Sequence, residues 1–121
     1  MVMLLIKIAA TYIKAANLLV IESNYDEQML LKGSYPYFLK ARIQSDNGHL
    51  GNHQMSAFLV DNIHENLSHI CLAHLSKNNN TPEIALQTIH KAFHEKGIAL
   101  NGKPRIVALN RNSPTEAIRL A

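Results

Sequence analysis

Residues 68–97 of this chain read SHICLAHLSKNNNTPEIALQTIHKAFHEKG. The apolar run at 68–74 is typical of a strand, and a loop of polar residues follows it. Thr81 is a suitable N-cap, the proline after it fits a first helical turn, and the final glycine is a suitable stop, so a helix is predicted over 82–96. Its predicted inward face consists of Ile84, Ala85, Thr88, Ile89, Ala92 and Phe93. The stretch therefore predicts a strand followed by an amphipathic helix.

The same alternation continues outward from this stretch. A strand is predicted downstream over 105–109, and a continuous apolar run at 18–22 is typical of a strand buried on both faces. Further helices are predicted over residues 4–16, 26–32, 36–44, 52–63 and, at the end of the chain, 115–121. This order predicts an α/β fold in which helices cover a sheet, with residues 1–121 in one domain.

Three expectations concern individual helix residues. Gly33 is expected to end the helix over 26–32 in the left-handed conformation that glycine favours. Apolar side chains at helical spacing predict the inward faces of the next two helices. They are Phe38, Leu39 and Ile43 in the helix over 36–44, and Met55, Phe58, Leu59 and Ile63 in the helix over 52–63.

Composition excludes few classes of function. The chain has 12 Lys and Arg residues against 9 Asp and Glu, and the resulting net charge of +3 permits a phosphate-rich partner without requiring one. The single cysteine, Cys71, lies in an apolar run and is expected to be a small buried hydrophobic residue in a reducing compartment. Lys7 and Lys14 interrupt the apolar N-terminal run, which argues against a signal peptide or a membrane span and favours a cytoplasmic protein.

Two polar clusters could carry chemistry. One is the turn at 48–52, which contains His49, and the other follows the strand at 68–74 and begins at His74. Ligands of open α/β sheets collect at the carboxyl ends of strands, where a histidine can bind a metal through one ring nitrogen. A single histidine at a strand end is also typical of a structural or surface residue. One histidine is in any case too few, since a catalytic zinc takes three protein ligands.

The other motifs that were considered carry little information about function. His90 and His94 are four residues apart, but Lys91 follows His90, so the HExxH pattern of zinc proteases is absent and a solvated helix surface is favoured. The chain also contains no GxGxxG, P-loop, CxxC or GxSxG motif. Nucleotide-binding and serine-hydrolase interpretations are therefore unsupported.

Two segments carry a family resemblance. IESNYDEQMLLKGSYPYFLKARIQSDNGHLGN at 21–52, followed by AHLSKNNNTPEIA at 73–85, is similar to metallo-β-lactamase-fold hydrolases of the YycJ/WalJ type. These bacterial cytoplasmic proteins resemble nucleic-acid phosphodiesterases and are described as DNA exonucleases. The similarity covers about residues 15–112. It implies that the chain is the C-terminal half of a four-layer αββα fold that uses two divalent ions, zinc or manganese, and acts on nucleic acid.

The resemblance also implies roles for individual residues. His74 matches the histidine that closes the dinuclear metal site, while His49 and Asn52 match catalytic residues that border the active site near the scissile phosphate. The remaining matched residues would shape the loop or support the metal ligands. They are Ser76, Asn79 and Asn80 in the loop, and Glu22 and Asn24 at a strand end.

Two departures from the family pattern matter. Gly51 stands where the family has serine, which predicts a looser turn. The family's HxHxDH motif, its next histidine and its bridging aspartate lie upstream, and residues 1–20 match none of them. We therefore expect a fragment that is inactive alone, with apolar strands that self-associate or bind the missing N-terminal half. The alternative is a non-catalytic remnant that acts as an interaction or nucleic-acid-binding module, so whether this chain is itself an enzyme stays open.

Overall fold

A parallel sheet is the centre of the fold. The computed structural model describes residues 17–45 and 48–109. Within them, β1 (Leu18–Glu22), β2 (His69–Ala73) and β3 (Arg105–Ala108) form a three-stranded parallel sheet in the order β1-β2-β3. Each strand lies within one residue of its predicted bounds, and the predicted α/β class is confirmed.

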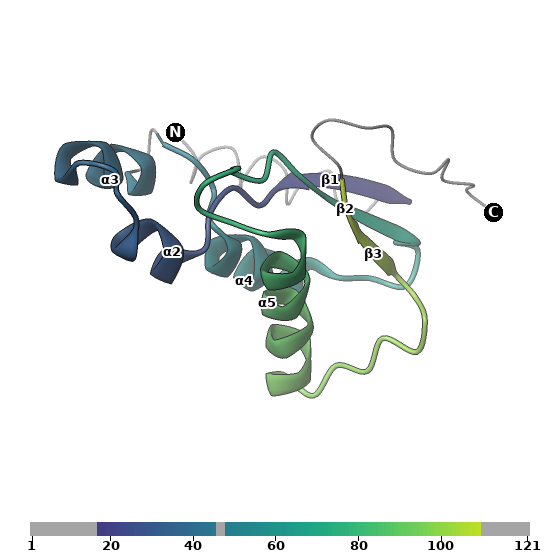
Figure 1. Ribbon diagram of the computed structural model, residues 1–121. Coiled ribbons are helices and arrows are strands. Elements are labelled where there is room, and N and C mark those ends of the chain that lie inside the picture. Colours follow the sequence, from purple (N-terminus) through teal and green to yellow (C-terminus); the bar gives the residue numbers. More distant parts are fainter. Residues whose placement is uncertain (1–16, 46–47, 110–121) are drawn as a thin grey trace.

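Four helices connect these strands in the described part of the chain (Figure 1). The segment between β1 and β2 contains α2 (Glu27–Lys32), α3 (Tyr37–Gln44) and α4 (Asn52–Asn62), whereas α5 (Pro82–Glu95) connects β2 to β3. The helices predicted over 4–16 and 115–121 lie outside the described residues. No helix among the described residues is long and apolar enough to cross a membrane.

The register of the sheet determines where polar side chains meet. Leu18 is paired with His69, and Glu22 at the end of β1 is paired with Ala73 at the end of β2. Parallel pairing brings the carboxyl ends of both strands to one edge of the sheet. Side chains that follow Glu22 and Ala73 in the chain therefore emerge side by side.

The hydrophobic core lies between the sheet and two helices, α4 and α5, which pack on the same face of the sheet (Figure 1). Fully buried side chains from each layer meet there, each contributing roughly 1.5–3 kcal/mol relative to exposure. They include Ile70 and Leu72 of β2, Met55 and Leu59 of α4, and Ile89 and Phe93 of α5. The predicted inward faces of these two helices are thus confirmed at their central residues.

The opposite face of the sheet is less covered. Val20 in β1 is 54% exposed, so the prediction that this strand is buried on both faces is wrong. The helices α4 and α5 pack on the other face, as successive right-handed crossovers in one direction must, and β1 is an edge strand of the described sheet, so Val20 is less covered than its register partner Cys71 in the central strand. Cys71 in the central strand is 2% exposed, as predicted for a small buried residue. Residues 17–45 and 48–109 form one sheet and one helical layer, and the four-layer arrangement stays a prediction.

Gly97 ends α5 as predicted. It has φ +71°, and its N–H donates to the carbonyl of His94 at 3.0 Å, while the N–H of Ile98 donates to Phe93 at 2.9 Å. These are the two hydrogen bonds of a Schellman motif. The matching prediction for Gly33 is wrong, because its φ is −74° and its backbone is extended. Glycine is needed at 33 for space, since a Cβ there would lie 2.9 Å from the carbonyl oxygen of Met29.

Helix α3 differs most from expectation. None of its residues is buried, and Phe38 is 73% exposed, so its predicted inward orientation is wrong. The reason is that α3 lies beside α2 at one end of the molecule, away from the core between the sheet and α4 and α5 (Figure 1). Leu39 and Ile43 are partly buried, and they line a hollow described below.

Candidate functional site

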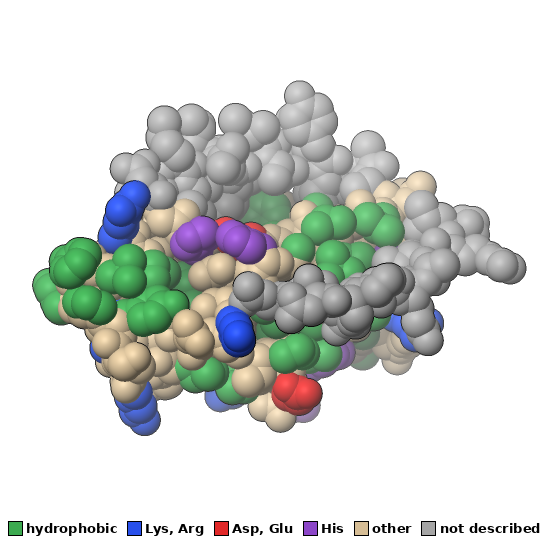
Figure 2. All heavy atoms as spheres, turned by 45° about the horizontal axis from the view of Figure 1, so that its top comes forward, with side chains coloured by type: hydrophobic (Ala, Val, Ile, Leu, Met, Phe, Trp, Pro, Cys, Tyr) green, Lys and Arg blue, Asp and Glu red, His purple; other side chains and the backbone are tan. Residues whose placement is uncertain are grey.

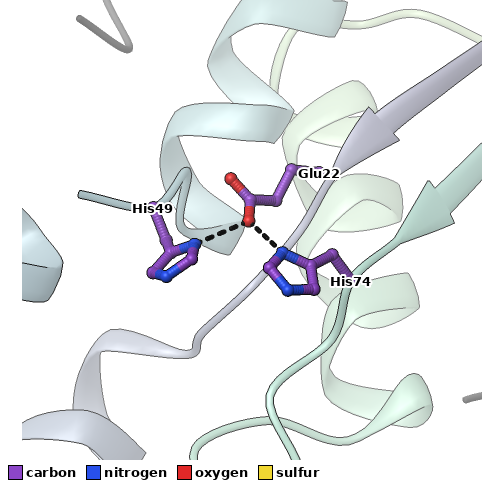
Figure 3. A group of neighbouring side chains, drawn as sticks. All are labelled: Glu22, His49 and His74. Atoms are coloured by element: carbon purple, nitrogen blue, oxygen red, sulfur yellow. Dashed lines mark hydrogen bonds and ion pairs between the residues drawn. The ribbon is translucent and has the colours of Figure 1, made fainter. Parts of the chain in front are cut away.

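Three side chains converge at the carboxyl edge of the sheet (Figure 3). Glu22 is the last residue of β1, His74 directly follows β2, and His49 lies in the turn before α4. Oε2 of Glu22 is 2.8 Å from Nδ1 of His49 and 2.5 Å from Nδ1 of His74. One carboxylate oxygen therefore contacts both imidazole rings.

Glu22 is held in its charged form. Its other oxygen, Oε1, accepts a hydrogen bond from the backbone N–H of Leu50 at 2.9 Å. Burial raises the pKa of this carboxyl, but the hydrogen bonds from Leu50, His49 and His74 together outweigh it, so the pKa lies below its ordinary value of 4.5. An ionised carboxylate accepts the Nδ1 proton of a neutral imidazole and leaves the Nε2 lone pair of that ring available.

The donor set is compatible with a divalent metal. One ligand atom from each of Glu22, His49 and His74 lies within 4.8 Å of the other two, and no other such group occurs among the residues that the structure describes. Imidazole nitrogen and carboxylate oxygen are common ligands of zinc, and carboxylates also suit manganese. Three groups could complete a mononuclear site, whereas a dinuclear site requires additional ligands.

The two rings are accessible from solvent. The side chains of His49 and His74 are 43% and 66% exposed, and the Glu22 side chain between them is 27% exposed. Their ring centroids are 5.2 Å apart with an interplanar angle of 62°. Figure 2 shows histidine side chains gathered on the surface of this face, next to hydrophobic side chains of the α2 and α3 end. A ligand could reach both rings without opening the core.

The backbone of His74 has an unusual conformation. Its φ is +59°, a left-handed value that side chains rarely adopt, and such a conformation costs about 1–3 kcal/mol, which surrounding contacts must offset. Asn24 supplies such a contact, because its Nδ2 donates to the carbonyl of His74 at 2.8 Å. The backbone of Asn24 also bonds to Leu50 at 2.8 Å and Ser76 at 2.7 Å. Asn24 thus joins the segments that carry the two histidines.

A buried polar network lies beneath the cluster. Ser23 Oγ donates to Asn52 Oδ1 at 2.5 Å, and Asn52 Nδ2 donates to Asn80 Oδ1 at 2.9 Å. Asn80 Nδ2 donates to the carbonyl of Ser23 at 2.8 Å, and the N–H of Thr81 donates to Asn80 Oδ1 at 2.9 Å. All three side chains of the network are at most 4% exposed. The network connects the end of β1, the start of α4 and the loop before α5.

The structure does not bring Asn52 into contact with the histidine cluster. Its side chain is fully buried within the network, whereas the sequence resemblance placed it at the border of the active site. Ser23, which the sequence reading did not single out, is an equal member of that network. The available signal was its position between Glu22 and Asn24, two residues that the resemblance did mark.

The loop after β2 is fixed by its own polar residues. Ser76 Oγ accepts a hydrogen bond from the N–H of Asn79 at 3.2 Å. The carbonyl of Asn79 accepts from the N–H of Asp26, the N-cap of α2, at 2.7 Å. Since Asn79 is 3% exposed, these contacts attach the loop to the protein and position His74 at its start.

Gly51 leaves no gap in the turn before α4. A Cβ at this position would lie 2.6 Å from Cζ of Tyr25, whose side chain is 2% exposed. The N–H of Gly51 donates to Oε1 of Gln54 at 3.0 Å, which fixes the first turn of the helix. The tyrosine ring therefore occupies the space that a side chain at 51 would take, and the looser turn expected from the sequence is wrong.

A surface hollow of about 510 Å³ adjoins the cluster. Its lining combines one apolar wall from α3 with polar groups from the loop after β2. The lining residues are Asn24, Tyr35, Leu39, Ile43, His49, His74, Leu75, Ser76, Lys77, Asn78 and Asn79. Its volume lies within the roughly 300–1,000 Å³ of small-molecule sites.

Fold and site together define an α/β chain with a candidate metal-binding cluster at the carboxyl edge of a parallel sheet. Comparison with known proteins identifies proteins that are similar to this chain in sequence. The chain is 39% identical over 104 residues to exodeoxyribonuclease YycJ of Bacillus anthracis, a match that covers 86% of this chain and 39% of that protein. It is 41% identical over 70 residues to exodeoxyribonuclease WalJ of Streptococcus pneumoniae, which covers 58% of this chain and 26% of that protein.

These matches support the resemblance to YycJ and WalJ that the motifs indicated. The chain spans about two fifths of the length of YycJ. No protein-family profile matches the chain. No solved structure matches it either.

Proposed function

We propose that this chain is the C-terminal part of a metal-dependent exodeoxyribonuclease with the metallo-β-lactamase fold. The observation that carries the proposal is the convergence of Glu22, His49 and His74 on one another. These residues come from segments far apart in the chain, and two of them lie in the GHL and HLS motifs that resemble the family. The names of the relatives supply the reaction class and the DNA substrate.

Each residue of the site has a proposed role. His49 and His74 use Nε2 to hold a divalent ion or to contact the scissile phosphate, because their Nδ1 atoms face Glu22. Glu22 orients both rings and increases their basicity, as carboxylates behind metal-bound histidines do. A bound zinc or manganese ion would supply an activated water and stabilise negative charge at the phosphodiester. Asn52, Asn80 and Ser23 keep the segments in register, and Asn24 holds the backbone at His74.

We further infer that residues 1–121 form one partial domain, and that the remaining metal ligands lie in an N-terminal half outside these residues. With the Nδ1 atoms of both rings facing Glu22, the cluster offers two ring nitrogens, fewer ligands than two ions need. Ser76 and Asn79 shape the loop next to the site. The lone buried Cys71 suits a reducing compartment, so we place the protein in the cytoplasm.

Metal titration of the chain tests the cluster directly. Calorimetric titration of the metal-free protein with zinc and with manganese should detect one weak site. His74→Ala and His49→Ala should abolish it, and Glu22→Gln should weaken it about 10–100-fold. His90→Ala, on the exposed surface of α5, is the matched control and should bind like the parent chain. Binding that survives His74→Ala would remove this residue from the ligand set.

The reaction itself is tested on the restored protein, in which the family's N-terminal half precedes this chain. It should degrade linear DNA only with a divalent ion, and His74→Ala should reduce the rate at least 100-fold. If the restored protein neither binds a metal nor degrades DNA, the second interpretation, a non-catalytic interaction module, is favoured. Its supporting observation is that the described residues contain only one group of metal-binding side chains.

A further inference from the structure

The hollow beside the histidine cluster has walls of two kinds. Tyr35, Leu39 and Ile43 form a wall of aromatic and aliphatic side chains, the latter two one helical turn apart on α3. Facing them, the loop after β2 contributes Ser76, Lys77 and Asn78, and the two histidines complete the lining. The hollow thus offers an apolar surface on one side and hydrogen-bonding and cationic groups on the other.

The ring of Tyr35 is fixed in this lining. Its hydroxyl oxygen accepts a hydrogen bond from Nδ2 of Asn78 at 3.1 Å, a contact that joins the segment between α2 and α3 to the loop after β2. A ring held at its far end loses little conformational freedom when a flat ligand packs on it. Such rings are the usual platforms on which single-stranded nucleic acids stack their bases.

The charge of the lining points to an anionic ligand. Lys77 is exposed, and the residues that line the hollow include no Asp or Glu, while the Glu22 carboxylate lies behind the two histidines at their Nδ1 atoms. The histidine cluster lies at the same hollow, so a phosphate there would sit between Lys77 and the two imidazole rings. The volume of about 510 Å³ is sufficient for a single nucleotide.

We propose that this hollow binds the terminal nucleotide of a DNA strand in an unpaired state, with its base against Tyr35 and its phosphate near Lys77. This inference rests on the proposed function, because it assigns the hollow to the DNA end on which an exonuclease acts. Tyr35 and Lys77 are then positioning residues, and His49 and His74 contact the phosphate between the terminal nucleotide and the next. The site selects a frayed or single-stranded end.

The test measures binding without chemistry. Fluorescence anisotropy follows a labelled single-stranded decanucleotide binding to the chain in the presence of a chelator. Tyr35→Leu should weaken binding about fivefold or more, whereas Tyr35→Phe, which keeps the ring, should stay within about twofold. Lys77→Gln should make the dependence of log K on log salt shallower by about 0.7, the loss of one phosphate contact. Lys91→Gln on the exposed surface of α5 should leave that slope unchanged.

An abasic end makes the assignment to the base specific. The same decanucleotide is prepared without a base on its terminal sugar, at the 5′ and at the 3′ end in turn. For one of these ends the parent chain should bind the abasic strand about fivefold or more weakly, and Tyr35→Leu should bind both strands equally. A Tyr35→Leu variant that still distinguishes the two strands, or a parent chain that distinguishes neither end, would overturn the proposal.

Failure of this proposal differs from failure of the proposed function. If the restored protein degrades DNA with a KM that Tyr35→Leu leaves unchanged, the hollow is not the nucleotide site, although the nuclease assignment stands. The opposite result is that the chain binds no metal and the restored protein degrades no DNA, while Tyr35→Leu still removes the response to the terminal base. In that case the hollow binds a terminal nucleotide, and the nuclease assignment is wrong. Circular dichroism and the unfolding midpoint of each variant confirm that it is folded.

Discussion

Glu22 shows how one side chain can organise a site. Its carboxylate contacts His49 and His74, which are 27 and 52 residues away in the chain. Sequence motifs mark all three residues, but they predict only a supporting role for Glu22 and do not predict which residues it contacts. The convergence itself depends on the strand register, which pairs Glu22 with Ala73, and on the turn that brings His49 back to the sheet. Neither is readable from local spacing.

The lowered pKa of Glu22 predicts an acid-dependent loss of stability. Because the folded pKa lies below 4.5, the folded state binds fewer protons, so the carboxylate stabilises the fold above pH 4.5 and less as the pH falls through the folded pKa. Glu22→Gln should therefore be less stable than the parent at pH 6, with the difference shrinking toward pH 3.5. Urea unfolding with a chelator measures this. Glu95→Gln, on the exposed face of α5, is the control, and a difference that does not change with pH would contradict the expectation.

Gly51 and Tyr25 pack against each other, and this contact gives a second prediction for single residues. Gly51→Ala should lower the free energy of unfolding by about 1–3 kcal/mol, because its Cβ would overlap the tyrosine ring. In a Tyr25→Leu background the same substitution should cost less, since the ring is absent. A double-mutant cycle by urea denaturation gives the coupling energy. Additive effects would show that the ring does not restrict position 51.

Among the elements, those with strong end signals and a packed face are predicted best. α5 has a Thr81 cap whose Oγ1 accepts from Ile84 N at 3.1 Å, a first-turn proline and a Gly97 stop, and its central apolar residues enter the core. α3 has apolar residues at similar spacing, but it does not pack on the core, and Phe38 is exposed. Periodicity identifies a helix, whereas the buried face depends on what the helix packs against.

The buried amides that connect the elements give the next prediction. Asn80→Ala removes the hydrogen-bond partner of the Ser23 carbonyl, of Nδ2 of Asn52 and of the N–H of Thr81, in a region that is at most partly exposed. We expect a loss of about 1–3 kcal/mol in the free energy of unfolding. Lys77→Ala, in the same loop but exposed, is the matched control, with a change within about 0.5 kcal/mol. Equal effects of the two substitutions would argue against the network as a stabilising element.

At the scale of the whole molecule, the main feature is the uneven covering of the two sheet faces by the residues that the structure describes. α4 and α5 cover one face, while Val20 on the other is 54% exposed. Parallel sheets are usually covered on both faces. The apolar strand runs were predictable from the sequence, but the face on which α4 and α5 pack was not, because that depends on the handedness of the connections.

The exposed Val20 side chain on the edge strand β1 predicts self-association that depends on concentration. Sedimentation velocity should show a larger average mass as the protein concentration rises, and Val20→Lys should shift the chain toward monomer. Asp61→Lys on the exposed surface of α4 introduces the same side chain elsewhere and should have little effect. A monomer at all concentrations for the parent chain would contradict the expectation, as would an equal response to both lysines.

The backbone of His74 has a consequence for how this chain evolves. At φ +59° a glycine or asparagine would relax the conformation, yet neither offers an imidazole. A histidine therefore persists there only while selection for its ring outweighs the conformational penalty. In a homologue that makes no use of the ring, the penalty is no longer offset, and glycine or asparagine is the residue expected at the position of His74.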